Sequence, residues 1–376
     1  MRIAMVAPLV ESVPPKYYGG TERVMDWLIK ALLQMGHRIT LFASGDSVTG
    51  AELHACVPKN LREMWKEIPD DQKPEDYVAW QKRYTKKMLD DVYLLAMNGE
   101  FDVVHLNVDD PYAFELFSDT NLPCAVVMTM HGRQDYKWLH AAYRKHPLPL
   151  VSISNNQREL MVPNANWAGT VYHGLPEDLY QVENAEQGEY LLFIGRTSPE
   201  KGLKQAIEIA VKANMELKIV AKIDPSEEDY FWKEIQPLIF ENHSLVKFCG
   251  EKGDAEKQEL LSGARALLFP ICWPEPFGLV MIEAMATGRP VIAYRHGSVP
   301  EVLQHGETGF IIKDDAEAAA LSVEMAKHLK PQNIRRIFKD RFSNVRMAEG
   351  YVEIYKKLIS ENQVARKPKA FTKLAG

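Results

Sequence analysis

The 376-residue chain contains no apolar run of the roughly 18 residues that a membrane-spanning helix requires. It also lacks a basic excess, since 45 Lys and Arg residues stand against 51 Asp and Glu residues and the formal net charge is −6. This balance disfavours a dedicated nucleic-acid-binding protein. The four cysteines form no Cys-x-x-Cys pair, which argues against a zinc site and fits the reducing cytoplasm.

Several nucleotide and metal motifs are missing as well. The sequence has no P-loop and no Gly-x-Gly-x-x-Gly fingerprint, which disfavours a hydride-transferring dehydrogenase. The histidines are scattered without a His-Glu-x-x-His pattern, so no metal is expected. Cys124, Cys249 and Cys272 lie in apolar runs and are expected to be small core residues. The apolar run 3–6 is too short for a signal-peptide core and predicts a buried strand.

The composition that is present is that of a globular protein, with 46% hydrophobic and 26% charged residues. The length favours two domains. The start of the chain predicts a strand, a Pro/Gly-rich loop, a helix that Thr21 can cap and a second strand, an order typical of a parallel sheet. The strands expected in this first half are residues 2–8, 38–43, 102–106, 125–130 and 150–154.

A second series of alternating strands and helices follows a linker near residues 163–190. Its expected strands are residues 191–194, 217–221, 246–249, 266–270, 291–294 and 310–312. The two series predict an α/β protein with two Rossmann-like, doubly wound domains that face each other across a cleft. Such domains bind ligands at the carboxyl ends of their strands. Residues 50–100 are less regular, apart from a helix expected at 77–97.

The glycines Gly19 and Gly20 follow Tyr18 between a strand and a helix. Two glycines let backbone amides approach an anion, and the start of a helix adds positive potential. The alternative is a tight turn that needs only the backbone freedom of glycine. In the second half, Arg196 and Lys201 follow a strand and flank its carboxyl end. Arginine binds phosphate with two parallel hydrogen bonds and lysine adds a point charge, although solvated surface cations are the alternative.

Two glutamates frame a later helix start. Glu275 lies in a proline-flanked loop after a strand, and Glu283 lies in the second turn of the helix. Carboxylates bind vicinal hydroxyl groups well, and the amides of residues 277–279 at the helix start can bind phosphate or sugar oxygens. His131 ends a strand of the first half, where it is either a structural histidine or a hydrogen-bonding group for a substrate.

Together these segments resemble the family 4 glycosyltransferases, which have the GT-B arrangement of two Rossmann-like domains. The similarity is strongest in three segments: GGTERVMDWLIKALLQMGHRITLFASGD, IGRTSPEKG and EPFGLVMIEAMATGRPVIAYRHGSVPEVLQHGETGF. The resemblance implies that Arg196 and Lys201 hold the diphosphate of a nucleotide sugar. It assigns the sugar to Glu275, with the amides of Phe277, Gly278 and Leu279, and the ribose hydroxyls to Glu283.

The resemblance also implies roles for the remaining candidates. Gly19 and Gly20 would let their loop close over the phosphates and the acceptor, and His131 would contact the donor sugar. The nucleobase of the nucleotide sugar would lie around Gly250 to Lys252. Family members retain the anomeric configuration and need no metal and no cofactor, because cations and helix N-termini neutralise the leaving diphosphate. A front-face route fits the available groups better than double displacement, for which no carboxylate nucleophile can be named.

The C-terminal helix of this family often crosses back onto the first domain. We therefore expect an N-terminal acceptor-side domain of residues 1–170 plus about 346–376. The C-terminal, donor-binding domain is expected to span residues 171–345. Two departures from the family touch the donor side, namely Lys222-Ile223-Asp224 in place of a Gly-rich turn and His173-Gly174 in place of Asn-Gly.

The sequence thus predicts a retaining transferase that moves a hexose from UDP-glucose or a similar UDP-sugar to an unidentified sugar, lipid-linked or small-molecule acceptor. The alternatives are a nucleotide-sugar 2-epimerase and a sugar-nucleotide-binding protein without turnover. A basic helix face could dock an anionic membrane at the inner face, but acidic neighbours favour a solvated face in a cytoplasmic protein. No nucleic-acid partner is expected and no oligomeric state is assigned. The basic residues are Lys82, Arg83, Lys86 and Lys87.

Overall fold

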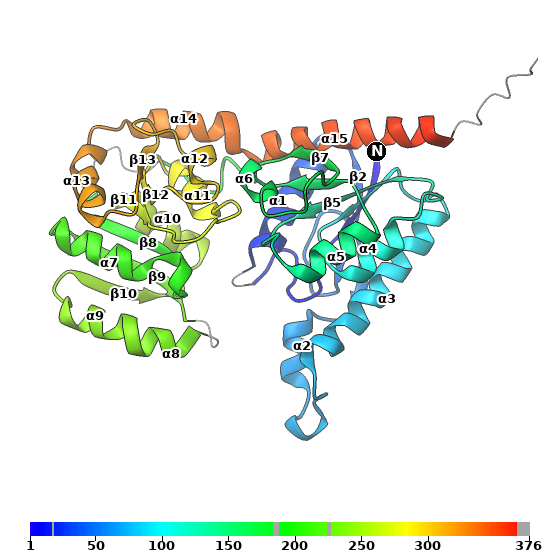
Figure 1. Cartoon of the computed structure of the whole chain (residues 1–376), viewed down its shortest axis with the longest axis horizontal. Helices are drawn as coiled ribbons and strands as arrows, with labels where there is room; N and C mark the ends of the chain where they lie inside the picture. Colours follow the sequence, from blue (N-terminus) through cyan, green and yellow to red (C-terminus); the bar gives the residue numbers. More distant parts are fainter. Residues whose placement is uncertain (17–18, 183–187, 224–226, 367–376) are drawn as a thin grey trace, which may run out of the picture. The chain divides into compact units, whose positions relative to one another are not determined.

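The computed structural model describes residues 1–16, 19–182, 188–223 and 227–366, and the chain divides into two compact units (Figure 1). The first unit comprises Met1–Ser152, Met161–Val171 and the chain from Ala348 onward, and the second comprises Ile153–Leu160 and Tyr172–Met347. Each unit is built on one parallel sheet that carries helices on both faces. The predicted fold class of two Rossmann-like α/β domains is therefore confirmed.

The first unit holds a seven-stranded parallel sheet in the order β3-β2-β1-β4-β5-β6-β7. The order reverses direction on either side of β1, as in a doubly wound sheet. Its elements are β1 (Arg2–Val6), α1 (Gly20–Gln34), β2 (Arg38–Ser44), β3 (Glu52–Val57), α2 (Leu61–Glu67), the 3-10 turn η1 (Asp70–Gln72), α3 (Tyr77–Met97), β4 (Val103–Leu106), α4 (Pro111–Phe117), β5 (Ala125–Met130), α5 (Lys137–Lys145), β6 (Leu150–Ser152) and β7 (Trp167–Thr170).

Both outermost strands of this sheet differ from the sequence prediction. β3 lies in the segment 50–100 that was expected to be irregular, and β7 lies in the segment that was expected to be a linker. Each pairs with one strand only, and most of its residues are partly exposed. Edge strands of this kind lack the continuous apolar run by which a buried parallel strand is recognised.

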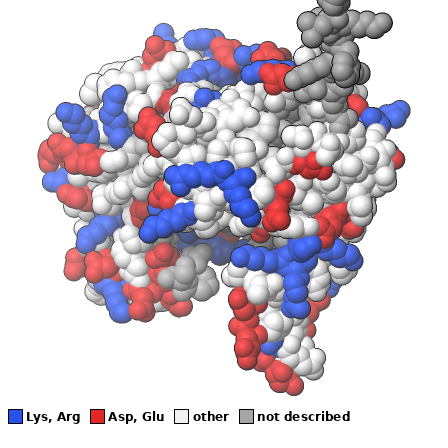
Figure 2. All heavy atoms as spheres, turned by 45° about the vertical axis from the view of Figure 1, so that its right-hand side comes forward, with Lys and Arg blue, Asp and Glu red and all other residues white. Residues whose placement is uncertain are grey.

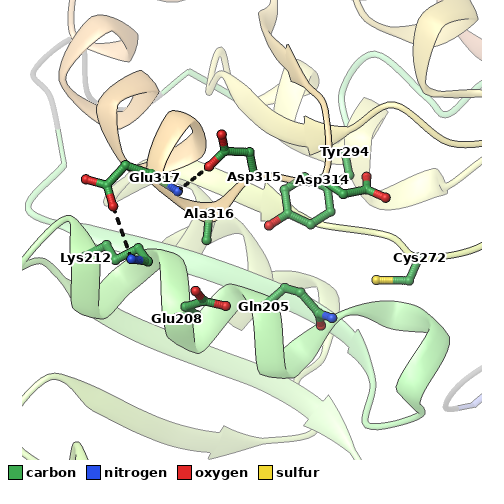
Figure 3. Close-up of a pocket in the computed structure, with 9 residues that line it drawn as sticks. All are labelled: Gln205, Glu208, Lys212, Cys272, Tyr294, Asp314, Asp315, Ala316 and Glu317. Carbon is green, nitrogen blue, oxygen red and sulfur yellow. Dashed lines mark hydrogen bonds and ion pairs between the residues drawn. The ribbon is translucent and has the colours of Figure 1, made fainter.

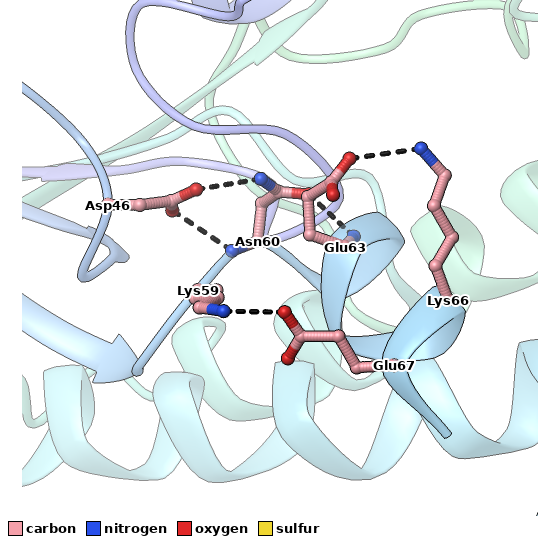
Figure 4. Close-up of polar contacts among 6 residues, drawn as sticks. All are labelled: Asp46, Lys59, Asn60, Glu63, Lys66 and Glu67. Carbon is pink, nitrogen blue, oxygen red and sulfur yellow. Dashed lines mark hydrogen bonds and ion pairs between the residues drawn. The ribbon is translucent and has the colours of Figure 1, made fainter. Parts of the chain in front are cut away.

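The helix α2 is held at its start by a group of polar contacts (Figure 4). The Asp46 carboxylate accepts hydrogen bonds from the backbone N–H of Asn60 at 2.9 Å and from its side-chain amide at 2.8 Å. The Asn60 side chain in turn accepts from the backbone N–H of Glu63 at 3.0 Å, which is the geometry of a helix N-cap. The ion pair between Lys59 and Glu67 lies outside this cap, on the exposed surface.

A buried polar network attaches the C-terminal helix α15 (Asn344–Arg366) to the first sheet. His105 on β4 is fully buried, with Nδ1 2.6 Å from the Tyr355 hydroxyl and Nε2 2.7 Å from Thr129 Oγ1. The Tyr351 hydroxyl lies 3.0 Å from the same Thr129 oxygen. Burial lowers the pKa of His105 to about 3, so its ring is neutral and each nitrogen has a hydroxyl partner.

The second unit holds a six-stranded parallel sheet in the order β10-β9-β8-β11-β12-β13. Its elements are α6 (Asn155–Arg158), β8 (Tyr190–Arg196), the 3-10 turn η2 (Pro199–Lys201), α7 (Leu203–Lys212), β9 (Glu216–Lys222), α8 (Glu228–Tyr230), the π-helical turn η4 (Phe231–Ile235), α9 (Gln236–Glu241), β10 (Val246–Gly250), α10 (Asp254–Ser262), β11 (Ala264–Phe269), α11 (Leu279–Ala286), β12 (Val291–Tyr294), α12 (Val299–Val302), β13 (Gly309–Ile312), α13 (Ala316–Ala326) and α14 (Pro331–Phe342).

The short segment Ile153–Leu160 lies in the second unit, although the sequence placed it in the first domain. The Glu301 carboxylate explains why this segment belongs to the second unit. Glu301 accepts hydrogen bonds from the backbone N–H groups of Asn155 and Asn156, each at 2.7 Å, and from the Tyr172 hydroxyl at 3.0 Å. A carboxylate that receives the N–H groups at a helix start binds strongly, and this contact fixes α6 to the second unit.

The surface of α3 bears both signs of charge. Its four basic residues Lys82, Arg83, Lys86 and Lys87 are exposed, and Lys86 pairs with Asp90 at 2.9 Å. On the face drawn in Figure 2, basic side chains gather in groups that have acidic side chains beside them. Within the described residues no helix is long and apolar enough to cross a membrane.

The prediction that Cys272 is a core residue is wrong, because it lies beyond β11 in an exposed loop, whereas Cys124 is buried.

Replacing Tyr355 by Phe removes one partner of the buried His105 ring and leaves a nitrogen without a hydrogen bond. We expect a loss of about 1–3 kcal/mol in the free energy of unfolding, measured by chemical denaturation. The control is Tyr93→Phe, which removes a hydroxyl that donates to Asp119 at 2.6 Å in a partly exposed position where water can replace it. Equal losses in the two variants would contradict the structural role given to the His105 network.

Candidate active site

Arg196 and Lys201 lie where the sequence predicts them, at the carboxyl end of β8. Neither cation stands alone. Arg196 lies 3.2 Å from the Glu200 carboxylate, and Lys201 Nζ lies 2.5 Å from Glu275 Oε2. The Lys201 and Glu275 side chains are only 15% and 12% exposed, so this ion pair is largely withdrawn from water. The fold thus brings together two predicted residues that are 74 positions apart.

Trp273 completes the surroundings of this pair. Its indole N–H donates to Glu275 Oε2 at 2.8 Å, and Lys201 Nζ lies 5.4 Å from the centre of its ring. The same carboxylate oxygen therefore accepts from an ammonium and from an indole. The sequence analysis did not select Trp273, although an aromatic residue two positions before a candidate carboxylate is a signal that could have been used.

Two glycines allow the loops around Glu275 to meet. A Cβ at Gly202, where φ is +76°, would fall 1.9 Å from the Pro270 carbonyl oxygen. A Cβ at Gly297, where φ is +54°, would fall 2.3 Å from the Glu275 backbone nitrogen. Only glycine fits such an approach and such a backbone conformation. The backbones of the loops after β8 and β12 therefore contact the loop after β11, one at Pro270 and the other at Glu275.

Hydrogen bonds lock the same three loops. The Cys272 backbone N–H donates to the Glu200 carbonyl oxygen at 2.9 Å. On the other side, the Ser298 backbone N–H donates to the Glu275 carbonyl oxygen at 3.0 Å, and the Ser298 hydroxyl donates to the Phe277 carbonyl oxygen at 2.7 Å. The backbone of residues 275–277 is thereby set before the helix α11 begins.

The helix α11 starts at Leu279, directly after Gly278, whose φ is +78°. The first amides of a helix have no acceptor in a preceding turn, so those of Phe277, Gly278 and Leu279 remain suited to an anion or a hydroxyl oxygen. The Phe277 side chain is itself core: it is 2% exposed and its ring lies 5.0 Å from that of His173. Only the backbone of Phe277 can serve a ligand.

Glu283 lies on α11 and is 4% exposed. Its Oε1 accepts from Lys257 Nζ at 3.2 Å, and Lys257 also lies 3.0 Å from Asp254. Its Oε2 is buried and has no hydrogen-bond partner within the described part of the chain. A buried carboxylate oxygen without a donor is costly, and a ligand hydroxyl would supply one. Sequence reasoning missed Lys257, since nothing local in the sequence connects it with a glutamate 26 positions later.

Gly250 and Lys252 lie on either side of the turn from β10 to α10. Gly250 has a φ of +71°, and a Cβ built there would meet nothing within 4 Å. Lys252 pairs with Glu256 at 2.8 Å on the exposed start of α10. The described contacts do not bring these two residues to the Lys201–Glu275 pair, but α10 carries Lys257, which reaches Glu283.

The remaining candidates lie in the first unit. Tyr18 lies outside the described residues; Gly19 precedes α1 in an extended conformation and Gly20 begins the helix. Glu22 in the first turn is 6% exposed, and burial raises its pKa to about 7. The start of α1 therefore carries a carboxyl group that binds its proton more tightly than an exposed glutamate does. The sequence analysis did not select Glu22, which the position at a helix start could have indicated.

His131 follows β5, and its Nε2 lies 2.9 Å from the Asn107 side-chain oxygen. Because that oxygen is an acceptor, Nε2 carries the proton of the neutral ring and Nδ1 offers a lone pair. Burial lowers the pKa of His131 to about 4, so the ring is uncharged at neutral pH. A neutral imidazole of this kind can bind a hydroxyl group without adding charge.

No group of three or more His, Cys, Asp or Glu side chains in the described ranges is arranged to hold a metal ion. In the second unit, Arg196 and Lys201 lie near carboxylates, and the helix α11 begins beside them with amides that its own turns do not use. Fold and site together define a class: a two-domain α/β protein whose second unit groups cations, carboxylates and the start of a helix at the carboxyl ends of its strands.

Comparison with known proteins finds a matching family model for the second unit. Residues 176–344 match the model of the family described as Glycosyl transferases group 1, and this range holds every candidate residue of the second unit. The chain is similar to a phosphatidyl-myo-inositol mannosyltransferase of Mycobacterium tuberculosis, with 23% identity over 339 residues and 86% of each chain covered. It is also similar to the N-acetyl-alpha-D-glucosaminyl L-malate synthase of Bacillus anthracis, with 25% identity over 382 residues that cover 92% of this chain and 96% of the relative.

Among solved structures, HepE of Anabaena in complex with UDP and glucose matches with a TM-score of 0.67 and 18% identity, and covers 95% of this chain and 100% of the other. Such solved neighbours have the GT-B fold. Residues 176–344 thus match the group 1 glycosyltransferases, and the chain is a glycosyltransferase. The resemblance seen in the sequence is confirmed.

Acidification is expected to destabilise the first unit through His131. Its folded pKa of about 4 lies below the ordinary 6.5, so between these values the unfolded chain takes up a proton that the folded chain does not. The free energy of unfolding is therefore expected to fall as the pH drops from about 6.5 towards 4. Denaturation series at pH 7 and pH 5 measure the difference, and His131→Asn is expected to reduce it. An unchanged pH dependence in that variant would contradict the neutral state of His131.

Replacing Gly297 by Ala is expected to displace the backbone of Glu275. The left-handed conformation costs about 1–2 kcal/mol for alanine, and the clash with the Glu275 nitrogen adds about 1–3 kcal/mol. Gly306→Ala is the matched control, since Gly306 has a φ of +80° but a Cβ there would meet nothing within 4 Å. Thermal or chemical unfolding compares the two variants. Equal destabilisation would show that Gly297 is needed only for its conformation.

Proposed function

We propose that the chain is a retaining glycosyltransferase that moves a hexose from UDP-glucose or a similar UDP-sugar to a sugar, lipid-linked or small-molecule acceptor. The observation that carries this proposal is the buried Oε2 of Glu283, which lacks a hydrogen-bond donor in the described chain. Vicinal ribose hydroxyls are donors of the right kind, because each can give one hydrogen bond to a carboxylate oxygen. Lys257 binds the other carboxylate oxygen of Glu283, Oε1, at 3.2 Å.

The Lys201–Glu275 pair suits the other half of a nucleotide sugar. A diphosphate would bind the Lys201 ammonium, and hydroxyl groups of the sugar would then replace this ammonium as hydrogen-bond donors to Glu275. The diphosphate would likewise replace Glu200 as the partner of Arg196, and the amides at the start of α11 would donate further hydrogen bonds to it. Lys201 and Glu275 thus each have a hydrogen-bonding partner in both situations, which limits the cost of burying them.

In the proposed reaction the bond between the anomeric carbon and the phosphate oxygen breaks, and the acceptor hydroxyl forms a new bond from the same face. The hydroxyl proton passes to a phosphate oxygen of the leaving diphosphate. Lys201, Arg196 and the α11 amides stabilise the negative charge that develops there, so electrostatic stabilisation is the main contribution of the protein. No metal and no cofactor is required in this scheme. His131 is proposed as a neutral hydrogen-bonding catalytic residue.

The choice of UDP is supported by HepE, which was solved with UDP, with UDP and glucose, and with UDP-glucose. The acceptor class is kept broad, because the two relatives are named for transfer to phosphatidyl-myo-inositol and to L-malate. Lys86 on α3 pairs with Asp90 at 2.9 Å, so the exposed basic residues of this helix have an acidic neighbour, which supports a location in the cytoplasm more than attachment to the inner membrane face.

Lys201→Ala and Glu275→Gln test the proposal. We expect Lys201→Ala to weaken UDP binding by about tenfold or more, since a charge-assisted contact is lost. Glu275→Gln is expected to lower sugar transfer by about a hundredfold. The control is Lys204→Ala on the same helix-loop segment, where an exposed lysine pairs with Glu234 at 3.2 Å and should leave both properties within about twofold.

Thermal-shift series with UDP, GDP and ADP rank the nucleotide, because a ligand that binds only the folded chain raises its melting temperature. Near-normal binding and transfer in both site variants would contradict the assignment of the donor site. Conversion of UDP-N-acetylglucosamine without any acceptor would point to a 2-epimerase instead. Stabilisation by UDP-sugars without turnover would point to a binding protein.

A further inference from the structure

A pocket of about 550 Å³ lies in the second unit between α7 and the beginning of α13, beside the carboxyl ends of β12 and β13 (Figure 3). It is separate from the candidate donor site. The helices α7 and α13 pack against each other, and α11 packs against α14. The connection from β8 through α7 to β9 and the connection from β11 through α11 to β12 run in opposite directions along the sheet. Because such crossovers are right-handed, the two pairs of helices lie on opposite faces of the sheet.

The pocket is strongly acidic. Its wall carries the carboxylates of Glu208, Asp314, Asp315 and Glu317 against a single cation, Lys212. Lys212 pairs with Glu317 at 3.1 Å, and Asp314 accepts from His296 at 2.8 Å. Four carboxylates that share one lysine leave a local excess of negative charge, which attracts cations into a concave site.

Glu208 and Asp315 retain the capacity to bind a cation. Glu208 has no ion pair or hydrogen bond to any other residue in the ranges that the structure describes. Asp315 caps α13 through Oδ1, which accepts from the backbone N–H groups of Glu317 and Ala318 at 2.9 and 3.1 Å. Its second carboxylate oxygen is not used by the cap, so two sides of the pocket offer acceptors.

A second and independent feature is the Tyr294 hydroxyl. Tyr294 is 3% exposed, and in the described residues its hydroxyl makes no hydrogen bond. Figure 3 shows the ring reaching from β12 with its hydroxyl directed into the space between α7 and Ala316. Burial, together with Glu208, Cys272 and the two aspartates 314 and 315, raises the pKa of Tyr294 to about 12, so the hydroxyl keeps its proton.

We propose that this pocket binds a small organic polycation of the polyamine class, with ammonium groups on the carboxylates and one N–H donated to the Tyr294 oxygen. A metal ion fits less well, because no cluster of metal-ligating side chains forms in the described chain and the volume far exceeds a single ion. A linear amine with several charges can reach acceptors on both walls at once. The pocket lies in the size range of small-molecule sites.

The experiment measures spermidine binding by titration calorimetry at low ionic strength, where contacts between charges are strongest. We expect saturable binding at one site. Glu208→Gln and Tyr294→Phe are expected to weaken it by about tenfold and about fivefold, since each removes one hydrogen-bonding partner of an ammonium group. Glu324→Gln is the matched control: it makes the same charge change on the exposed face of α13 and should alter binding by less than about twofold.

The proposal is overturned if spermidine gives no saturable signal with the unmodified chain. It is overturned equally if Glu324→Gln weakens binding as much as Glu208→Gln, which would indicate attraction to the surface charge in general, or if Mg²⁺ or neutral glucose binds this pocket as tightly. Melting temperatures of the variants without amine verify that they are folded, and Tyr294→Phe keeps the buried ring. UDP binding is recorded in parallel, so a failure of the donor-site proposal is distinguished from a failure here.

Discussion

The close approach of three loop backbones at Glu275 is the constraint on which the site of the second unit depends. Gly202 against Pro270 and Gly297 against Glu275 leave no room for a side chain. Loops lack the regular hydrogen bonding of helices and strands, so functional groups on loops need such outside support to keep one geometry. The indole of Trp273, the Lys201 ion pair and the amides at the start of α11 all take their positions from this contact.

The site also arranges charge in a particular way. Lys201, Arg196 and Lys257 each pair with a glutamate, so the charge of each of these three residues is compensated without a ligand. A diphosphate alone would bind Lys201 and Arg196 but would leave the buried Glu275 carboxylate without the Lys201 ammonium. A ligand that brings hydroxyl groups with the diphosphate satisfies both members of the pair. Discrimination by a buried group that would otherwise be unpaired is stronger than discrimination by shape alone.

The sequence predicts the second unit better than the first for a physical reason. Its buried parallel strands are apolar runs, so the sequence could place Arg196, Lys201 and Glu275 just beyond strand ends, where such sheets bind ligands, and the family resemblance assigned the three residues to one ligand. The half-exposed edge strands β3 and β7 carry no such signal. Contacts between distant residues, such as Lys257 with Glu283 or Glu301 with the start of α6, arise only when the chain is folded, so spacing could not reveal them. The roles inferred for the candidate site residues of both units, including His131, Gly19 and Gly20, stay predictions.

The loop that carries Glu275 has different neighbours on its two sides. Cys272 lines the acidic pocket, whereas Trp273 and Glu275 face Lys201. A ligand in one site affects the other only if it interacts differently with two arrangements of the shared loop. The Cys272–Glu200 hydrogen bond and the contact at Gly297 hold that loop from both sides. A segment that is fixed in this way has one arrangement, so we expect that ligands of the two proposed sites would bind independently of each other.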